Sequence, residues 1–272
     1  MQYITEKDKQ SLFSKVEGKE YKVCDLQNAL WKLGIRKGDT VCVHSQIYSL
    51  GMAGMPRNKY LNMILKVLKE AVGEDGTIIM PAFSYSFCEN QVFDVQKSKS
   101  TVGLLTEFFR NSEGVSRTVH PIFSFSVWGR RKEEFLDIST DAFSMESVYG
   151  KMIQSNDKMI LLGADKGYTI YYLAEESIGV SHRFFKNFSG IVRDGEKEYE
   201  LTVPYYVRCL DKRSEENPQS VSAYLLEKGI EKSVPFGWGS ISSFLCKPMF
   251  ESIVEKLKED ETYFLKEKSK YE

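Results

Sequence analysis

Apolar strand-like segments alternate with amphipathic helix-like segments between residues 24 and 178. Leucine and isoleucine recur every three or four positions in residues 24–34 and 60–72, which predicts helices there. Further helices are predicted at residues 102–110 and 169–178. Buried strands are predicted between these helices, at residues 40–44, 76–81, 122–128 and 159–163. Strands joined by helices in this way form a partly parallel sheet with helices on both faces.

The pattern changes after Phe188. Residues 190–203 alternate around Asp194-Gly195, which is a strong signal for a β-hairpin. Two more helices, at residues 218–228 and 247–258, flank a predicted strand pair between residues 236 and 244. We therefore expect an α/β fold of three layers, a mixed central sheet with helices on both faces, and a β-rich C-terminal third on the same core.

The chain is expected to form a single domain over residues 1–272, because no repeat or Pro/Gly/Ser-rich linker divides it. Residues 1–20 are predicted to be an N-terminal extension, and residues 260–272 a charged, solvated C-terminal tail.

Charge and cysteine content exclude several classes of protein. The 37 Lys+Arg nearly balance the 38 Asp+Glu, which argues against a nucleic-acid binder. No apolar run reaches the ~20 residues that span a bilayer, and the N-terminus does not resemble a signal peptide. The 5 cysteines include no CxxC, which predicts reduced thiols in a cytoplasmic protein and no metal site. A homo-oligomer is compatible with the sequence.

Common nucleotide and hydrolase motifs are absent, but the 3 histidines are informative. The sequence has no GxxxxGK[ST], GxGxxG, GxSxG or HExxH. His44 ends a predicted strand, His120 precedes Pro121, and His182 follows the helix at 169–178. Ligands of open α/β sheets gather beyond the carboxyl ends of strands, so His44 and the residues after it are candidates for a site. Each histidine could instead be a hydrogen-bonded structural residue.

Five segments, taken in order, resemble the aminoglycoside 3-N-acetyltransferase family over roughly residues 25–250. These segments are Gly38–Gly51, Gly76–Phe83, Val102–Arg110, Val115–Gly129 and Leu161–Glu175. The resemblance implies transfer of an acetyl group from acetyl-CoA to the amine of a sugar. It also implies an α/β fold distinct from the commoner acetyltransferase fold, whose R/Q-x-x-G-x-G/A loop this sequence lacks.

The resemblance points to His44, Ser45 and Gln46 for the thioester end of CoA and to His120 for the acceptor amine. The Ser45 hydroxyl or a nearby backbone N–H could stabilise the oxyanion, or Ser45 could merely cap a turn. His120 could orient the acceptor or relay a proton, or it could simply be packed. Arg117 could bind a CoA phosphate, or it could be a solvated arginine on a turn.

The sequence departs from the family in one important position. The family's helix reads T-x-x-H-x-x-E, and its histidine resembles a general base; here Tyr172 stands in that slot, between Thr169 and Glu175. A tyrosine is a poor base at neutral pH but can donate a hydrogen bond. Three interpretations stay open. The base has moved to His120, His182, Glu175 or Glu176, or the reaction needs little base, or the protein only binds sugar or CoA. Tyr172 and Glu175 are expected on one helix face, where they would polarise the reacting centre.

The acceptor is predicted from aromatic and basic residues near the motifs. Phe83, Ser84 and Tyr85 follow the second strand, and His182 and Arg183 follow the signature helix, with no acidic run beside them. Such residues suit a stacked base and a diphosphate, although the phenylalanines could instead be core. They also resemble the family's branch in surface-polysaccharide (lipopolysaccharide/O-antigen) biosynthesis. The leading hypothesis is therefore a dTDP- or UDP-linked deoxyamino sugar. The alternatives are an aminoglycoside 3-N-acetyltransferase conferring antibiotic resistance, which predicts converging acidic residues, and a non-catalytic sugar- or CoA-binding protein.

Overall fold

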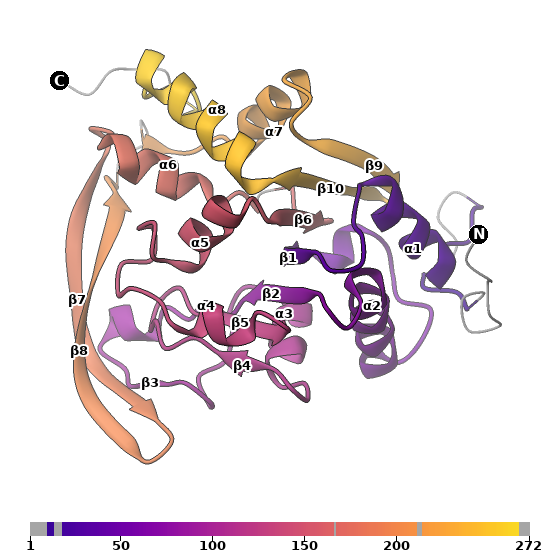
Figure 1. Ribbon diagram of the computed structural model, residues 1–272, viewed down its shortest axis with the longest axis horizontal. Coiled ribbons are helices and arrows are strands. Elements are labelled where there is room, and N and C mark those ends of the chain that lie inside the picture. The colour runs from indigo at the N-terminus through magenta and orange to yellow at the C-terminus, as the bar shows by residue number, and fades with distance from the viewer. Residues whose placement is uncertain (1–9, 14–17, 166, 211–213, 267–272) are drawn as a thin grey trace.

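A computed structural model describes residues 10–13, 18–165, 167–210 and 214–266 (Figure 1). The helices are α1 (Val23–Lys32), α2 (Arg57–Val72), α3 (Leu104–Arg110), α4 (Lys132–Leu136), α5 (Val148–Ser155), α6 (Tyr171–Ile178), α7 (Pro218–Glu227) and α8 (Cys246–Glu259). The strands are β1 (Thr40–Ser45), β2 (Thr77–Pro81), β3 (Phe93–Asp94), β4 (Ser116–Arg117), β5 (Phe125–Gly129), β6 (Lys158–Leu162), β7 (Arg183–Asp194), β8 (Lys197–Arg208), β9 (Lys232–Phe236) and β10 (Gly239–Leu245). The predicted helices and strands are all present, with boundaries shifted by a few residues, and α4, α5, β3 and β4 are additional.

The central sheet has the strand order β4-β5-β2-β1-β6-β10-β9. β1 pairs in parallel with β2 and with β6, while β5 and β10 are antiparallel to their neighbours. The carboxyl ends of the three parallel strands, at Ser45, Pro81 and Leu162, therefore meet at one edge. The sheet is mixed, as predicted.

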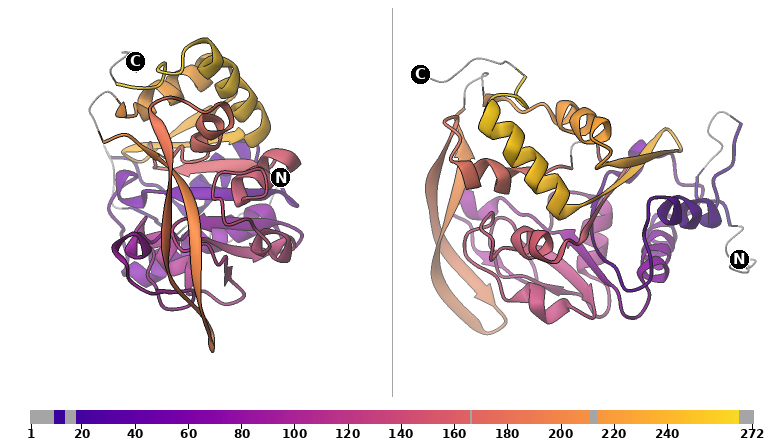
Figure 2. Two further views of the ribbon diagram at one scale, coloured as in Figure 1. Left: turned by 90° about the vertical axis from the view of Figure 1, so that its left-hand side faces the viewer. Right: turned by 45° about the horizontal axis from the view of Figure 1, so that its top comes forward.

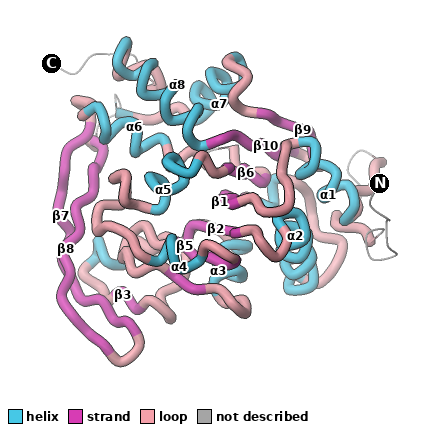
Figure 3. Tube along the Cα trace, in the orientation of Figure 1, coloured by secondary structure: helices cyan, strands magenta, loops and turns pink. Residues whose placement is uncertain are grey.

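Helices cover both faces of this sheet, so the prediction of three layers is confirmed (Figure 3). Val41 and Val43 of β1 point to the face that packs against α1, α2 and α3. Cys42, between them, points to the opposite face, which packs against α5, α6, α7 and α8. Successive strand residues face opposite ways, so a strand buried on both sides is apolar throughout, as the sequence pattern indicated.

The long hairpin β7–β8 forms a second sheet with β3 (Figure 2). It is longer than predicted, and it runs along one side of the molecule beside α6 (Figure 1, orange). Val192 and Val203 on its inner face are fully buried in the same apolar cluster as α5 to α8. β9 and β10 instead extend the central sheet. The β-rich C-terminal third is therefore built onto one core through two different sheets.

The end of the chain is less solvated than predicted. Phe264 and Leu265 are buried, so residues 260–266 pack against the body of the protein because they bring two large apolar side chains. Residues 267–272 of the predicted tail lie outside the described residues, as do residues 1–9 and 14–17 of the predicted N-terminal extension. Leu12 and Phe13 of that extension are also buried. The division of the chain into domains stays a prediction.

Gly163 allows the loops after β1 and β6 to approach closely. Its φ is +70°, and a Cβ there would lie 2.4 Å from Ser49 Oγ and 2.8 Å from the Gln46 carbonyl oxygen. Gly163→Ala is therefore expected to lower the free energy of unfolding by about 2–4 kcal/mol, from backbone strain and overpacking together. Gly195, in the hairpin turn, has a φ of +62°, and a Cβ at this position would meet no atom within 4 Å, so Gly195→Ala carries only the strain, about 1–2 kcal/mol. Urea unfolding of both variants measures the difference, and equal losses would contradict the close approach.

Candidate active site

A pocket of about 260 Å³ opens where the three parallel strands end. We call it the strand-end pocket. It brings together six of the residues predicted from the sequence: His44, Ser45, Gln46, Phe83, Tyr85 and Tyr172. It is the place where the sequence motifs after β1, β2 and β6 converge, as the strand-end rule predicted.

The Ser45 hydroxyl is the polar group of this pocket that most directly indicates a ligand. Its Oγ is buried and has no hydrogen-bond partner among the described residues. The alternative that Ser45 caps the following turn is therefore wrong. A buried hydroxyl without a partner lowers the stability of the folded protein. Such a hydroxyl is therefore well placed to hydrogen-bond a polar group of a ligand. The N–H of Gln46 donates to the Leu162 carbonyl at 2.9 Å, which leaves the Ser45 hydroxyl as the better oxyanion donor of this loop.

His44 is held neutral beneath the pocket. It is buried, its Nε2 lies 3.0 Å from the Tyr149 hydroxyl, and burial lowers its pKa to about 4. A neutral, bonded imidazole brings no charge to the pocket, and the predicted contact of His44 with the thioester end of CoA stays a prediction. His44 therefore contributes shape and a fixed dipole to the pocket wall.

His120 is placed differently from the sequence-based expectation. Its Nδ1 accepts hydrogen bonds from the N–H groups of Ile122 (3.2 Å) and Phe123 (3.0 Å), so Nε2 carries the proton and donates to the Thr140 carbonyl at 3.0 Å. His120 is buried and is not part of the strand-end pocket lining. Both ring nitrogens hold backbone in place, so the expected role in assisting the amine does not fit this geometry.

This geometry predicts a pH effect on stability. Burial lowers the pKa of His120 from 6.5 to about 4, so the unfolded chain binds its proton more readily. The stabilisation is complete above pH 6.5 and is lost as the pH falls towards 4. His120→Asn keeps an acceptor for the two N–H groups but cannot titrate. We therefore expect wild type to lose about 2 kcal/mol more than the variant between pH 7 and pH 5, measured by urea unfolding. An equal loss of unfolding free energy in wild type and variant between pH 7 and pH 5 would contradict this structural role. A ~100-fold fall in kcat of His120→Asn would contradict it as well.

Tyr172 lies in the wall of the strand-end pocket with its hydroxyl bound to a carboxylate. The hydroxyl donates to Glu216 Oε2 at 2.8 Å, and the guanidinium of Arg183 stacks 4.2 Å from the ring centre. Burial and then the charge of Glu216 raise the pKa of Tyr172 well above its usual value. Tyr172 is therefore a neutral phenol that lines the pocket and is bonded to a carboxylate.

Glu175, His182 and Arg183 form a buried network behind Tyr172. Glu175 Oε1 accepts a hydrogen bond from Tyr171 at 2.7 Å and lies 2.9 Å from His182 Nε2. Arg183 Nε lies 2.6 Å from Glu175 Oε2, and Nη2 pairs with Glu216 at 2.5 Å. The strand-end pocket lining includes none of these three predicted residues. This geometry does not support a direct catalytic role of Glu175 or direct substrate binding by His182 and Arg183, because each side chain faces another protein group.

Arg117 and Ser84 are also structural. Arg117 donates to the Ala82 carbonyl at 2.6 Å and to Ser124 Oγ at 3.0 Å, and stacks on the Phe93 ring. The predicted contact with a CoA phosphate is therefore not supported. Ser84 is buried, with Ser86 and the Pro121 carbonyl as its neighbours, and it does not line the strand-end pocket.

Phe83 and Tyr85 do line the pocket, together with Phe123 and Tyr205, which the sequence analysis did not single out. Phe83 is buried and packs edge to face against Phe123, with 5.1 Å between the ring centres. It therefore lines the pocket and also belongs to the hydrophobic core. Tyr85 is 42% exposed and can offer its ring to a sugar. The hairpin brings Tyr205 to the pocket over a long sequence separation, which no local motif indicates.

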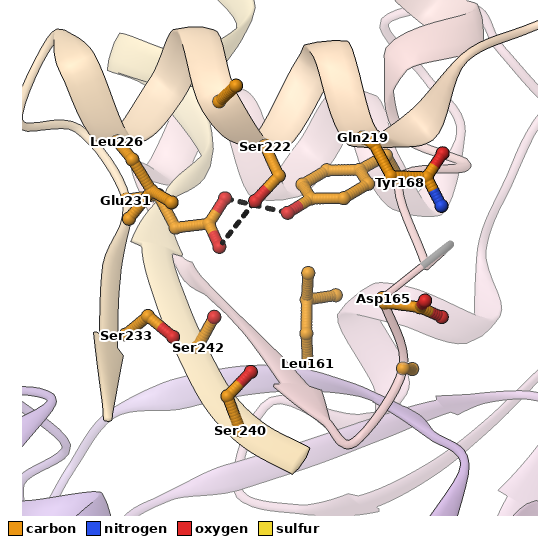
Figure 4. A pocket seen from close by; sticks show the side chains of 12 residues that line it. Leu161, Asp165, Tyr168, Gln219, Ser222, Leu226, Glu231, Ser233, Ser240 and Ser242 are labelled. Carbon is orange, nitrogen blue, oxygen red and sulfur yellow. Dashed lines mark hydrogen bonds between the residues drawn. The ribbon is translucent and has the colours of Figure 1, made fainter. Parts of the chain in front are cut away.

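A second pocket, of about 340 Å³, shares Ala164 with the first. Figure 4 shows this second pocket from close by. We call it the serine pocket, because Ser222 of α7, Ser233 of β9 and Ser240 and Ser242 of β10 line it. Its buried carboxylate, Glu231, accepts hydrogen bonds from Tyr168 (2.7 Å) and Ser222 (3.4 Å). Asp165 supplies a second carboxylate.

Carboxylates line two cavities that share residues with the strand-end pocket. The serine pocket holds Asp165 and Glu231, and a small cavity beneath Thr169 and Tyr172 holds Glu216. No lysine or arginine lines any of these three spaces among the residues that the structure describes. The acidic groups come from segments far apart in the sequence, which is why no acidic run appears beside the motifs.

Two general findings concern metals and membranes. Within the described residues, no group of three or more His, Cys, Asp or Glu is arranged to hold a metal ion. No helix of the described part is long and apolar enough to cross a bilayer. The predicted cytoplasmic location and any homo-oligomer stay predictions.

The fold and the site together define a class: a mixed α/β protein with a small-molecule pocket at the carboxyl ends of its parallel strands, holding a buried, unpaired hydroxyl. The sequence profile of the family described as aminoglycoside 3-N-acetyltransferase matches residues 42–258. The chain belongs to this family of N-acetyltransferases, so the predictions of family and of enzyme class are confirmed.

Individual relatives agree with this assignment. The chain is 29% identical over 171 residues (54% of the chain) to the SPbeta prophage-derived aminoglycoside N(3')-acetyltransferase-like protein YokD of Bacillus subtilis, and spans 61% of that protein. It is 24% identical to aminoglycoside N(3)-acetyltransferase IV of Salmonella sp. over 90% of the chain and 91% of that protein. Its fold matches the AAC-IIIb structure in binary complex with CoASH with a TM-score of 0.75, at 20% identity, over 92% of the chain and 99% of that structure. The expected fold is therefore confirmed.

Proposed function

We propose that this protein transfers an acetyl group from acetyl-CoA to an amine of an aminoglycoside. The observation that carries the acceptor class is the serine pocket, whose lining holds Asp165 and Glu231 and no described lysine or arginine, beside the hydroxyl-rich strand-end pocket. Aminoglycosides carry several ammonium groups, and charges of opposite sign favour their approach and binding. The names of the family and of its Salmonella relative support the same acceptor.

The thioester end of acetyl-CoA is assigned to the loop after β1. The unpartnered Ser45 hydroxyl can donate a hydrogen bond to the thioester carbonyl as that oxygen gains negative charge. The attacking amine must be neutral and close to that carbon, and the walls formed by Tyr85, Tyr172 and Tyr205 supply rings and hydroxyls that can hold a sugar. A CoA-bound structure among the fold neighbours supports the choice of cosubstrate.

The nucleotide-linked amino sugar is the weaker acceptor. That hypothesis needed cations for a diphosphate and took them from Arg183 and Lys186, with Arg117 as a candidate for a nucleotide phosphate. Lys186 is exposed on β7 and does not line the strand-end pocket. Arg183 is paired with Glu175 and Glu216, and Arg117 binds backbone carbonyls and Ser124. Neither guanidinium is available to a diphosphate, and none of the relatives named above supports a role in lipopolysaccharide or O-antigen biosynthesis.

A thiol-release assay distinguishes the candidate acceptors. The protein is mixed with acetyl-CoA and, in turn, with gentamicin, apramycin, and dTDP- and UDP-linked amino sugars. We expect free CoA only with the aminoglycosides, and faster release at low than at high ionic strength because the acceptor is polycationic. Release with nucleotide sugars alone would overturn the acceptor class. Binding of CoA without release in any mixture would support a non-catalytic protein instead.

A further inference from the structure

We propose that Glu216 receives, through the Tyr172 hydroxyl, the proton that the acceptor amine loses during acetyl transfer. This inference rests on the proposed function and concerns its proton acceptor. Tyr172 is the catalytic residue because it lines the strand-end pocket and its hydroxyl is bonded to Glu216. Glu216 acts through Tyr172 and is a positioning and relay residue.

The contacts of Tyr172 suit a relay. Its hydroxyl donates to Glu216 Oε2 at 2.8 Å, so the lone pairs of the same oxygen are left for a donor in the pocket. Glu216 lines the small cavity on the other side of Tyr172, and its side chain is 22% exposed. An amine N–H that donates to Tyr172 is therefore connected to a carboxylate through one hydroxyl.

The other candidates for a base are used elsewhere. His120 binds backbone with both nitrogens, and Glu175 bonds Tyr171 and neighbours His182 and Arg183 behind the pocket wall. Glu176, which does not line the strand-end pocket, faces the carboxyl group of Asp141. Of the described carboxylates, Glu216 is the one bonded to a hydroxyl of the strand-end pocket.

The charged groups around Glu216 hold its side chain in place and affect its pKa. Tyr172 and Glu175 face it from α6, Arg183 from β7 and Arg208 from β8. Arg183 bridges Glu216 and Glu175 and stacks on Tyr172, which fixes the three side chains relative to one another. Burial, followed by the opposing effect of Arg183, leaves the pKa of Glu216 raised, which makes this carboxylate a better proton acceptor than an exposed glutamate.

The step balances without any further reactant. The amine nitrogen forms a bond to the thioester carbon, and the carbonyl electrons move onto the oxygen beside Ser45. The nitrogen gives its proton to Tyr172 as Tyr172 gives its own to Glu216. The carbonyl then re-forms, the C–S bond breaks, and the CoA thiolate takes up the proton as Glu216 and Tyr172 return it. The products are the acetamide and CoA thiol.

A double-mutant cycle tests the relay with gentamicin and acetyl-CoA. We expect Glu216→Gln and Tyr172→Phe each to lower kcat by about 100-fold, and the double variant to lose no more than either single variant. In wild type, kcat should rise with pH as Glu216 loses its proton, and this acid limb should be absent in Glu216→Gln. KM for acetyl-CoA should stay unchanged, because neither residue is assigned to CoA.

Two outcomes would overturn the relay. If Glu216 only braces the fold, Glu216→Gln lowers kcat equally in the wild-type and Tyr172→Phe backgrounds, and the acid limb persists. If Glu216→Gln fails to fold, Tyr172→Phe alone tests the relay, because this variant keeps the ring stacked on Arg183 and removes only the hydroxyl. A pH profile of kcat for Tyr172→Phe that equals that of wild type excludes the relay. Absence of turnover in wild type is distinguishable, since it overturns the proposed function itself.

Discussion

Ser45→Ala is expected to lower kcat/KM for acetyl transfer by about 100- to 1,000-fold. The Ser45 hydroxyl is buried, lacks a partner among the described residues and lines the strand-end pocket. Removing one pre-oriented oxyanion donor costs other acyl-transfer enzymes about this factor. The free energy of unfolding should hold or rise slightly, because the substitution removes a buried polar atom without removing a hydrogen bond. Initial rates of thiol release and urea unfolding measure the two effects.

Ser126 offers a matched control for this variant. It is also a strand serine with a buried Oγ that has no partner among the described residues, but it lies on β5 and does not line the strand-end pocket. Ser126→Ala should leave kcat/KM unchanged. If both alanine variants lose activity equally, or if neither does, Ser45 has no special role in the reaction.

Arg183→Met is expected to lower the free energy of unfolding by about 3–5 kcal/mol. The arginine is almost completely buried between Glu175 and Glu216, so its removal leaves two carboxylates without their cation. Arg193, on the same strand, pairs with Glu198 at 2.6 Å, but both side chains are about half exposed. Arg193→Met should lower the free energy of unfolding far less than Arg183→Met does, because solvent screens the exposed pair.

Urea unfolding curves of the two arginine variants decide whether Arg183 is structural. A large loss for Arg183→Met alone is the expected result. A stable Arg183→Met variant whose KM for the acceptor rises steeply would instead restore the role in substrate binding that the sequence suggested.

The sequence predicted the fold well where periodicity is strong. α1, α2, β1, β2 and β6 lie within a few residues of their predicted positions, because each is long or apolar enough to show its period. α5 was not predicted, since it is only 8 residues long and too short to show a clear period, although Ser147 gives it an N-cap that accepts a hydrogen bond from Gly150. The hairpin β7–β8 extends beyond its predicted ends because the pairing continues through residues 183–189, where buried and exposed side chains do not alternate regularly.

The parts of the candidate site that lie directly after parallel strands were predicted from the sequence. The parts that depend on which charged side chains pair with one another were not. The loop around Ser45 and the aromatic residues Phe83 and Tyr85 meet in one pocket, as expected from their positions after parallel strands. The lack of an acidic run beside the motifs was taken to favour a diphosphate-bearing acceptor, but the linear sequence does not tell which charges are already paired. Arg183 is neutralised by Glu216, 33 residues away, a contact that only the tertiary structure creates.

The most direct test of the central claim is the identity of the acetylated product. Gentamicin incubated with the protein and acetyl-CoA should gain one acetyl group by mass spectrometry, and NMR should place that group on a single amine. The Ser45→Ala variant under the same conditions should yield little product. Unmodified gentamicin after complete incubation with wild-type protein, alongside acetylation of a nucleotide-linked amino sugar, would contradict the account.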